Sequence, residues 1–185
     1  MYARYESFDS PPRWALDERY IDARCAERYG LRWNKGWIIP VWAPRVTDPV
    51  MHLMGWQFKQ LEVINFPRGV KKSHTLFGMA QCSKRRAVLV ESPLDVVRMA
   101  SVGVNAVAAF GAMVSNFQIG LLEARFDAVG IALDADEQGR TQTERIYPLL
   151  RRRLPTQILD FGPGIKDPGE ATDEHVQKVC ARFSS

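Results

Sequence analysis

The stretch RAVLVESPLDVVRMASVGVNAVAAFG, residues 86–111, decides the fold class of this chain. It holds a near-continuous apolar run at 87–91, a helical pattern at 93–103 and a second apolar run at 105–110. Short, continuously apolar runs are typical of strands that are buried on both faces of a parallel sheet. A helix between two such strands makes a right-handed crossover unit. The stretch therefore predicts the beginning of a parallel α/β domain.

The same alternation continues to the end of the chain. Further strands are expected at 128–134 and 156–161, with helical patterns at 115–126 and 137–154 and a closing helix at 172–182. Strands that alternate with helices favour a sheet with helices on both faces. Residues 87–185 are thus predicted to form a Rossmann-like α/β domain with a parallel sheet of about four strands.

The first 86 residues do not show this alternation of strands and helices, and we expect them to form a small α+β subdomain. DERYIDARCAERY (residues 17–29) predicts one amphipathic helix that ends at Gly30. GWIIPVWAP (36–44) and LMGWQFKQ (53–60) predict two antiparallel strands, joined by a connection through Thr47-Asp48-Pro49. Between residues 68 and 86 there are six Lys or Arg and no Asp or Glu, so the end of this subdomain is basic.

Composition narrows the class of protein. Of 185 residues, 46% are hydrophobic and 25% are charged, which is average for a globular chain and argues against disorder. No run of about 18 apolar residues is present, so no membrane segment is expected. The three cysteines do not have zinc-ligand spacing, and no GxxxxGK[ST] phosphate loop is found. We expect a cytoplasmic protein without zinc.

Carboxylates follow two of the predicted strands. Glu91 ends the first strand, and Asp134 and Asp136 follow the third. The carboxyl ends of parallel strands share one edge of the sheet, where three acids would repel one another unless a cation lay between them. Mg²⁺ and Mn²⁺ prefer such oxygen ligands. The pattern predicts a metal site for phosphoryl transfer, although Asp134 and Asp136 also suit an ordinary acidic turn before a helix.

Asp95 has two interpretations. Ser92-Pro93-Leu94-Asp95 has the composition of a helix start, with serine at the N-cap, proline at N1 and an acid in the first turn. Asp95 therefore serves either the helix start alone or the carboxylate site as a supporting residue.

Three segments together resemble the Toprim domain shared by DnaG-type primases, topoisomerases and some nucleases: VLVESPLDVVRMASVGVNAVAAFG, FDAVGIALDADEQGRTQTERI and GIKDPGE. The resemblance covers about residues 86–179. It implies that Glu91 is a general acid/base or metal ligand, and that Asp134 and Asp136 are the metal ligands of the DxD motif. Gly111 matches the glycine turn after the second strand, and Gly139 the last residue of DxDxxG. These three acids are our predicted catalytic residues.

The chain departs from the family at one place. Ser92-Pro93 stands where the family usually has a glycine after the glutamate. The proline fixes φ and removes an amide donor, which changes the loop that follows Glu91.

The residues before the Toprim-like region resemble the core of DnaG-type primases. GWIIPVWAP, LMGWQFKQ and NFPRGVKKSHTLFGMAQ are similar to the primase order of an "IPI" strand, a "GxxxR" strand and a basic segment that leads into "LYG". The resemblance is to the C-terminal half of the primase RNA-polymerase core. It implies a nucleotidyltransferase that makes RNA primers on a single-stranded DNA template from ribonucleotide triphosphates, with up to two Mg²⁺ or Mn²⁺ ions. It also implies a separate zinc-module protein and a replicative helicase as partners.

Basic side chains near the predicted site are candidates for binding nucleic acid or nucleotide. These are Arg68, Lys71, Lys72, Arg140 and Lys166. A phosphate contact by each of them would position the strand and depend on salt. For Lys71 and Lys72 the alternative is a solvated loop, and for Arg140 it is an ion pair with Glu144.

Other polar and aromatic residues have alternatives of their own. Asp167, in a family loop near the metal edge, also suits a plain Asp-Pro-Gly turn. Trp37, Trp42 and Trp56 either stack on bases or pack the subdomain core, and His74 is expected to be a polar surface residue.

Two other functions fit the same residues. A Toprim nuclease would use the same acids to cut a phosphodiester. An accessory factor would bind single-stranded nucleic acid or a replication partner without turnover.

Overall fold

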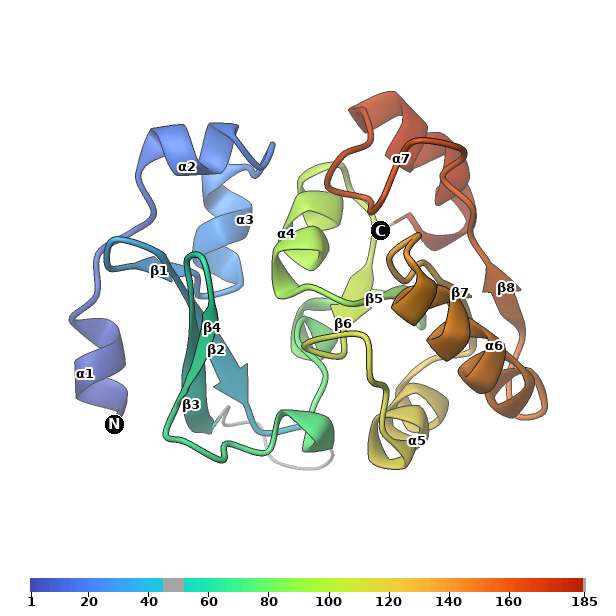
Figure 1. The fold of residues 1–185 in the computed structure, drawn as a ribbon, viewed down its shortest axis with the longest axis horizontal. Helices are drawn as coiled ribbons and strands as arrows, with labels where there is room; N and C mark the ends of the chain where they lie inside the picture. Colours follow the sequence, from blue (N-terminus) through green and yellow to red (C-terminus); the bar gives the residue numbers. More distant parts are fainter. Residues whose placement is uncertain (45–51, 185) are drawn as a thin grey trace.

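A computed structural model describes residues 1–44 and 52–184. The predicted connection at Thr47-Asp48-Pro49 lies outside these residues. Two four-stranded sheets lie side by side, the first from residues 32–66 and the second from residues 86–158 (Figure 1). The chain order of the second sheet alternates strand and helix, which confirms the predicted α/β class.

The second sheet is parallel, with the order β6-β5-β7-β8. Its strands are β5 (Arg86–Val90), β6 (Ala106–Ala108), β7 (Ala128–Ile131) and β8 (Thr156–Ile158). The covering helices are α4 (Pro93–Ser101), α5 (Asn116–Arg125), α6 (Glu137–Arg151) and α7 (Asp173–Val179), followed by the 3-10 turn η3 (Ala181–Phe183). The predicted last helix, 172–182, thus ends as an α-helix at Val179.

The two faces of this sheet belong to two separate cores, because side chains alternate along a strand. Val88 and Val90 of β5 join the core that contains α4 and α7 residues. Ala87 and Leu89 join the core that contains α5 and α6 residues. Figure 1 shows the same arrangement, with α4 and α7 on one side and α5 and α6 on the other. Burial on both faces explains why the strands have no polar alternation.

The first sheet is antiparallel, with the order β1-β2-β3-β4. The strands are β1 (Arg32–Trp33), β2 (Trp37–Trp42), β3 (Leu53–Lys59) and β4 (Val63–Phe66). The predicted pair is present as β2 and β3, and the two outer strands are additions that the sequence reading missed. Two 3-10 turns, η1 (Lys72–His74) and η2 (Met79–Gln81), follow.

The predicted helix at 17–29 is wrong. The chain forms three short helices instead: α1 (Tyr2–Glu6), α2 (Arg13–Asp17) and α3 (Ala23–Arg28). Tyr20 has a φ of 51°, which no α-helix accommodates. The side chain of Asp22 accepts hydrogen bonds from the amides of Arg24 and Cys25 and so begins a new helix.

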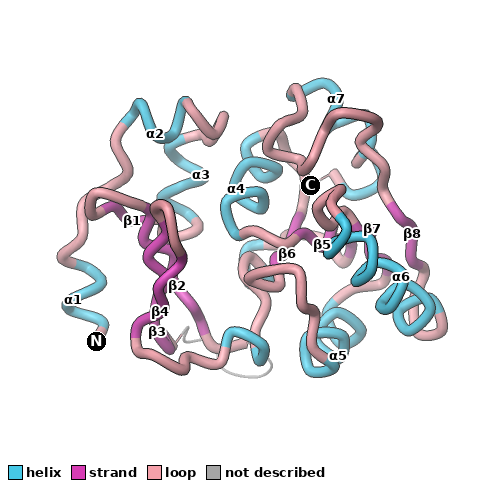
Figure 2. Tube along the Cα trace, viewed as in Figure 1, coloured by secondary structure: helices cyan, strands magenta, loops and turns pink. Residues whose placement is uncertain are grey.

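The two sheets share one core. Leu16, Ile39 and Val41 from the first region belong to the same buried cluster as Val96 and Val97 of α4. None of the described helices is long and apolar enough to cross a bilayer. Loops without regular structure connect β4 to η1 and β8 to α7 (Figure 2).

Candidate functional site

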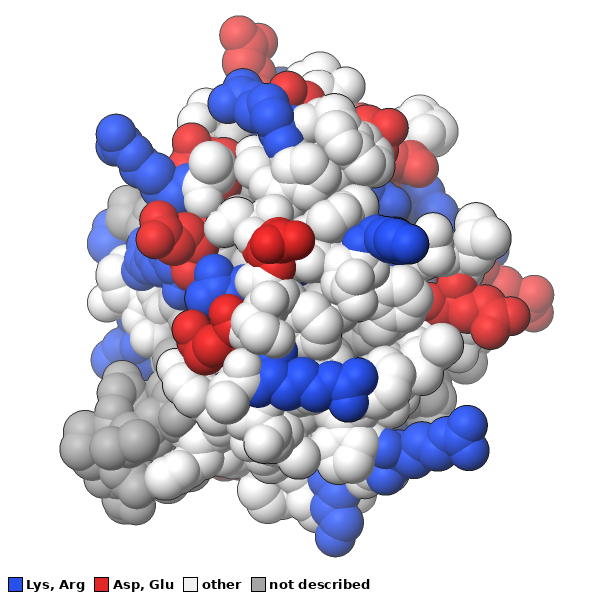
Figure 3. All heavy atoms as spheres, turned by 90° about the vertical axis from the view of Figure 1, so that its left-hand side faces the viewer, with Lys and Arg blue, Asp and Glu red and all other residues white. Residues whose placement is uncertain are grey.

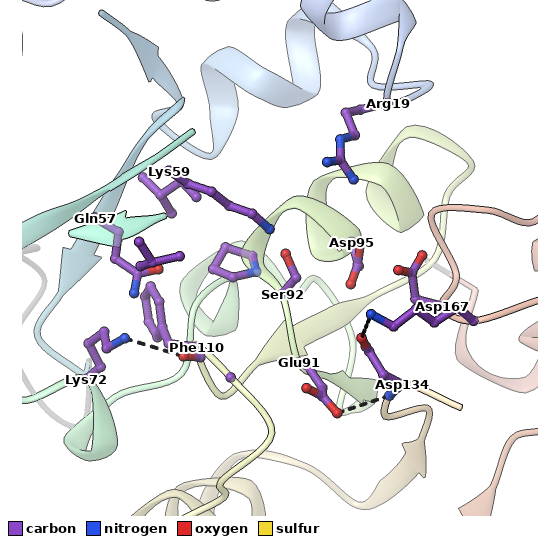
Figure 4. A pocket seen from close by; sticks show the side chains of 15 residues that line it. Arg19, Gln57, Lys59, Lys72, Glu91, Ser92, Asp95, Phe110, Asp134 and Asp167 are labelled. Carbon is purple, nitrogen blue, oxygen red and sulfur yellow. Dashed lines mark hydrogen bonds and ion pairs between the residues drawn. The ribbon is translucent and has the colours of Figure 1, made fainter. Parts of the chain in front are cut away.

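A cavity of about 430 Å³ lies between the two sheets. Its described lining combines acidic residues from the parallel-sheet region with basic residues from both regions. The acids are Glu91, Asp95, Asp134 and Asp167, and the bases are Arg19, Lys59, Lys72 and Lys166. Figure 4 shows Lys59 reaching toward the cavity from the side opposite the acids and Arg19 pointing toward it from above Asp95. A site with both signs of charge suits a ligand that combines a cation with phosphates.

Glu91, which follows β5, is hydrogen-bonded to residues that follow the two neighbouring strands, β6 and β7. Its side-chain Oε1 accepts a hydrogen bond of 3.1 Å from the backbone amide of Asp134, and its carbonyl oxygen accepts one of 2.9 Å from Gly111. Burial, followed by the charge of Asp134, raises the pKa of Glu91 to about 7. Glu91 and Asp134, two of the three acids predicted to meet, therefore lie together at one rim of the sheet (Figure 4), and Gly111 lines the same cavity.

Three carboxylates converge beside Glu91. Asp95, Asp134 and Asp167 each offer one oxygen, and these oxygens all lie within 4.8 Å of one another. Asp95 is only 4% exposed, and burial followed by the charges of Asp167 and Asp134 raises its pKa to about 8. Burial also raises the pKa of Asp134, against the opposing effect of Lys166. A cation among these oxygens would relieve their repulsion.

Two glycines leave the carboxylates room. A Cβ atom at Gly139 would lie 2.1 Å from the carbonyl oxygen of Asp134 and 2.9 Å from Oε1 of Glu91. A Cβ atom at Gly169 would lie 2.9 Å from Oδ1 of Asp167. The closely packed acids and their hard oxygen donors fit Mg²⁺ or Mn²⁺, and they offer no sulfur or imidazole ligand for zinc.

Asp136, the third predicted metal ligand, caps a helix and is not part of the carboxylate cluster. Its Oδ1 accepts a 2.9 Å hydrogen bond from the amide of Gly139, so it caps α6. Its Oδ2 lies 3.9 Å from Nζ of Lys166, whereas Oδ2 of Asp134 lies 3.2 Å from the same nitrogen. Among the described residues, the carboxylate cluster consists of Asp134 with Asp95 and Asp167, which we expected to be supporting residues, and it does not include Asp136.

Ser92-Pro93 explains the position of Asp95. The hydroxyl of Ser92 accepts a hydrogen bond from the amide of Leu94, and Pro93 occupies the first turn, where its missing N–H costs nothing. α4 therefore begins directly after Glu91 and carries Asp95 into the cluster. Asp167 arrives on the loop between β8 and α7.

The predicted basic residues divide into two groups. Lys72 and Lys166 line the cavity, and burial lowers the pKa of Lys72. Arg68 and Lys71 are exposed and are not among the described lining residues. Arg140 donates a 2.7 Å hydrogen bond to the carbonyl of Ala135, at the start of its own helix.

Sequence reasoning missed Arg19, Gln57 and Lys59. Gln57 and Lys59 are two residues apart on β3, so they share a face of the strand, and this alternation was the available signal. Gln57 is 4% exposed and donates a hydrogen bond to Asn65. Arg19 follows α2, and no sequence pattern marked it as a site residue, since only the packing of the two regions brings it to the cavity.

The aromatic residues of the first sheet pack a core. Trp37 and Trp56 are buried, and the ring of Trp42 makes an edge contact with Tyr5 at 5.9 Å. Of the two alternatives for these tryptophans, the structure supports packing. The outer face of this region, seen in Figure 3, intersperses Lys and Arg with Asp and Glu and has broad uncharged areas.

Residues 88–172 match the family described as Toprim-like. This region is a Toprim-like domain. The match spans the four parallel strands from β5 onward, together with all the clustered carboxylates, which confirms the predicted Toprim fold. No curated protein matches the sequence.

Solved primase structures share the fold of nearly the whole chain. The Aquifex aeolicus primase (zinc-binding and RNA polymerase domains) is 22% identical with a TM-score of 0.73, and the match covers 93% of this chain and 55% of that one. The E. coli primase catalytic core is 17% identical with a TM-score of 0.71, covering 98% and 74%. The primase fragment of the bacteriophage T7 primase-helicase is 17% identical with a TM-score of 0.63, covering 96% and 80%. The chain thus spans about half of the Aquifex aeolicus structure, and these likenesses confirm the predicted primase-core fold.

Proposed function

We propose that this protein is a primase-type nucleotidyltransferase that makes RNA on a single-stranded DNA template. The observation that carries the proposal is the cavity in which clustered carboxylates share the lining with Lys59 of the antiparallel sheet and with Arg19, Lys72 and Lys166. A polymerase needs the acids to hold the metal and cationic side chains to hold a triphosphate, and this cavity contains both.

The Toprim-like residues would hold the metal. Asp95, Asp134 and Asp167 provide three oxygens for Mg²⁺ or Mn²⁺, and Glu91 and Asp136 lie beside them. When bound, the metal supplies charge neutralisation for the phosphates and a lower pKa for the attacking 3′ hydroxyl.

The remaining chemistry belongs to the protein side chains. Glu91 is held by the amide of Asp134 and lines the cavity, where a carboxylate can accept the proton of the incoming hydroxyl. Lys59, Lys72 and Lys166 can neutralise the triphosphate and orient it along the cavity.

Template, nucleotides and partners complete the proposal. The substrates are single-stranded DNA and ribonucleotide triphosphates, and the proposed partners are a zinc-module protein and a replicative helicase in the cytoplasm of a bacterial or phage-infected cell. The basis is the likeness to the Aquifex aeolicus structure, whose name includes a zinc-binding domain, and to the T7 primase-helicase fragment.

The test is incubation with end-labelled single-stranded DNA and labelled ribonucleotides in Mg²⁺ or Mn²⁺, with and without a zinc-module partner. Short RNA that disappears in Asp134→Ala and Glu91→Gln supports the proposal. Shortened DNA would instead reveal a nuclease. DNA binding that persists in EDTA, with no turnover in any metal, would reveal an accessory factor.

A further inference from the structure

Two rings are stacked on the surface beside the cavity. The imidazole of His74 and the phenyl ring of Phe117 lie 4.9 Å apart at an interplanar angle of 22°. Phe117 is 49% exposed, Met113, four residues earlier in the chain, is 64% exposed, and His74 is exposed as well. The expectation that His74 is only a polar surface residue omitted this ring contact. Large apolar groups that gather outside a core commonly mark a binding surface.

Hydrogen bonds fix the backbone segments that carry the two rings. Gln118 follows Phe117, is fully buried, and donates hydrogen bonds to the carbonyl oxygens of Thr75 (2.8 Å) and Ala109 (3.0 Å). Ser115 and Gln118 form a reciprocal capping box at the start of α5. The turn that carries His74 and the helix that carries Phe117 are therefore tied together, and little ordering is needed before a ligand binds.

The rings also adjoin the cavity. Lys72 belongs to the same one-turn helix as His74, lines the cavity, and lies 3.5 Å from the carbonyl oxygen of Phe110. Gly111 lines the cavity as well, two residues before Met113. A polymer that leaves the cavity on this side would meet the ring pair next. Figure 1 shows η1 and α5 next to each other, and the hydrogen bonds of Gln118 join the same segments.

The basic side chains near the ring pair favour single-stranded nucleic acid as the ligand. Lys71 and Arg68 are exposed on the segment before His74, and this segment contains no acidic residue up to residue 86. Ring faces for bases, with cations for phosphates, are the combination that single-strand binding surfaces use. An apolar protein partner would have no need of the cations.

We propose that His74, Met113 and Phe117 form a stacking platform for the bases of the single-stranded template as it leaves the cavity, with Arg68 and Lys71 contacting its phosphates. The proposal rests on the function proposed above, and it adds the place and the manner in which the strand is held.

The test is fluorescence anisotropy with a labelled single-stranded oligonucleotide in EDTA, where no turnover occurs. A second oligonucleotide of the same length carries abasic residues and so keeps the phosphates without the bases. The wild-type protein should bind the oligonucleotide with bases more tightly. Phe117→Leu should lose roughly 5- to 150-fold of that affinity and leave the binding of the abasic strand unchanged. Phe117→Tyr keeps the ring and should bind like the wild type.

Tyr2→Leu is the matched control. Tyr2 is an exposed ring (57%) in contact with Tyr5, on α1 at the other end of the molecule in Figure 1. Its loss should not change DNA binding. Equal affinities of wild type and Phe117→Leu, or an equal loss in Tyr2→Leu, would overturn the platform.

The two proposals fail separately. Asp134→Ala should abolish turnover and keep the difference between the two oligonucleotides. A protein that shows this difference but makes no RNA refutes the primase function and keeps the platform. A protein that makes RNA while Phe117→Leu binds normally refutes the platform alone.

Discussion

Replacing Gly139 with alanine should disturb the site, because this glycine packs closely against the backbone of Asp134. The new Cβ atom would lie 2.1 Å from the carbonyl oxygen of Asp134, whereas carbon–oxygen contacts are ordinarily about 3.3 Å or longer. The loop or the helix must therefore move by about 1 Å. The same displacement shifts Glu91, whose side chain is bonded to the amide of Asp134.

The size of the effect follows from two opposing terms. Alanine is better than glycine inside a helix by about 0.5–1 kcal/mol. Overpacking costs about 1–3 kcal/mol, and a clash with backbone belongs to the upper part of that range. We expect a net loss of about 2 kcal/mol, which corresponds to a fall in Tm of about 4–8 °C for a chain of this size. Mn²⁺ affinity should fall at least roughly tenfold, since the residues that orient the ligands are displaced.

Gly120→Ala is the control. Gly120 lies inside α5, and a Cβ atom there would have nothing within 4 Å. This variant gains the higher helix propensity of alanine without a steric clash. Its Tm should therefore rise slightly, and its Mn²⁺ affinity should stay the same. The measurements are thermal unfolding without metal and calorimetric titration with Mn²⁺. If Gly139→Ala matched Gly120→Ala in both, the close packing of α6 against the Asp134 loop would be refuted.

Further predictions concern the carboxylates and one helix cap. Asp134→Ala should abolish Mn²⁺ binding in calorimetry without lowering the Tm of the metal-free protein, because it removes one of several repelling charges; unchanged affinity would contradict the site. The pKa values of Glu91 and Asp95 are raised to about 7 and about 8. A raised carboxyl pKa gives stability that is present below the unfolded value and lost as pH rises through the folded value. The metal-free protein should thus be more stable at pH 6 than at pH 8.5, and Mn²⁺ should bind more tightly at pH 8.5; the opposite trend in either measurement would exclude the buried acids as the cause. Asp22→Ala should cost about 1 kcal/mol of unfolding free energy in urea, as expected for a lost N-cap, whereas Asp127→Ala, which removes only an exposed ion pair, should cost less.

The sequence predicted best where one physical constraint acted alone. The strands of the Toprim-like region are buried on both faces, so their apolar runs were unambiguous, and the strand ends placed Glu91 next to Asp134. The helix predicted at 17–29 was wrong because its apolar spacing competed with the capping side chain of Asp22, which periodicity does not register.

The full set of charged residues at the cavity was harder to predict for a different reason. Asp95 and Asp167 approach Asp134 only because the start of α4 and the loop after β8 meet, 72 residues apart in the chain. Arg19 and Lys59 reach the cavity only through the packing of one sheet region on the other. Such meetings depend on tertiary structure, which local pattern does not encode.

The buried cluster that joins the two regions has a practical consequence for anyone who trims the chain. Expressing residues 87–185 alone would remove Leu16, Ile39 and Val41 from the buried cluster that includes the α4 residues, and it would cut the pairing of Phe77 with Ala108. The isolated fragment would expose a hydrophobic surface to water and should aggregate. Because the same buried cluster joins the two regions that line the cavity, the nucleotide that we propose as substrate would bind in a site that is already formed.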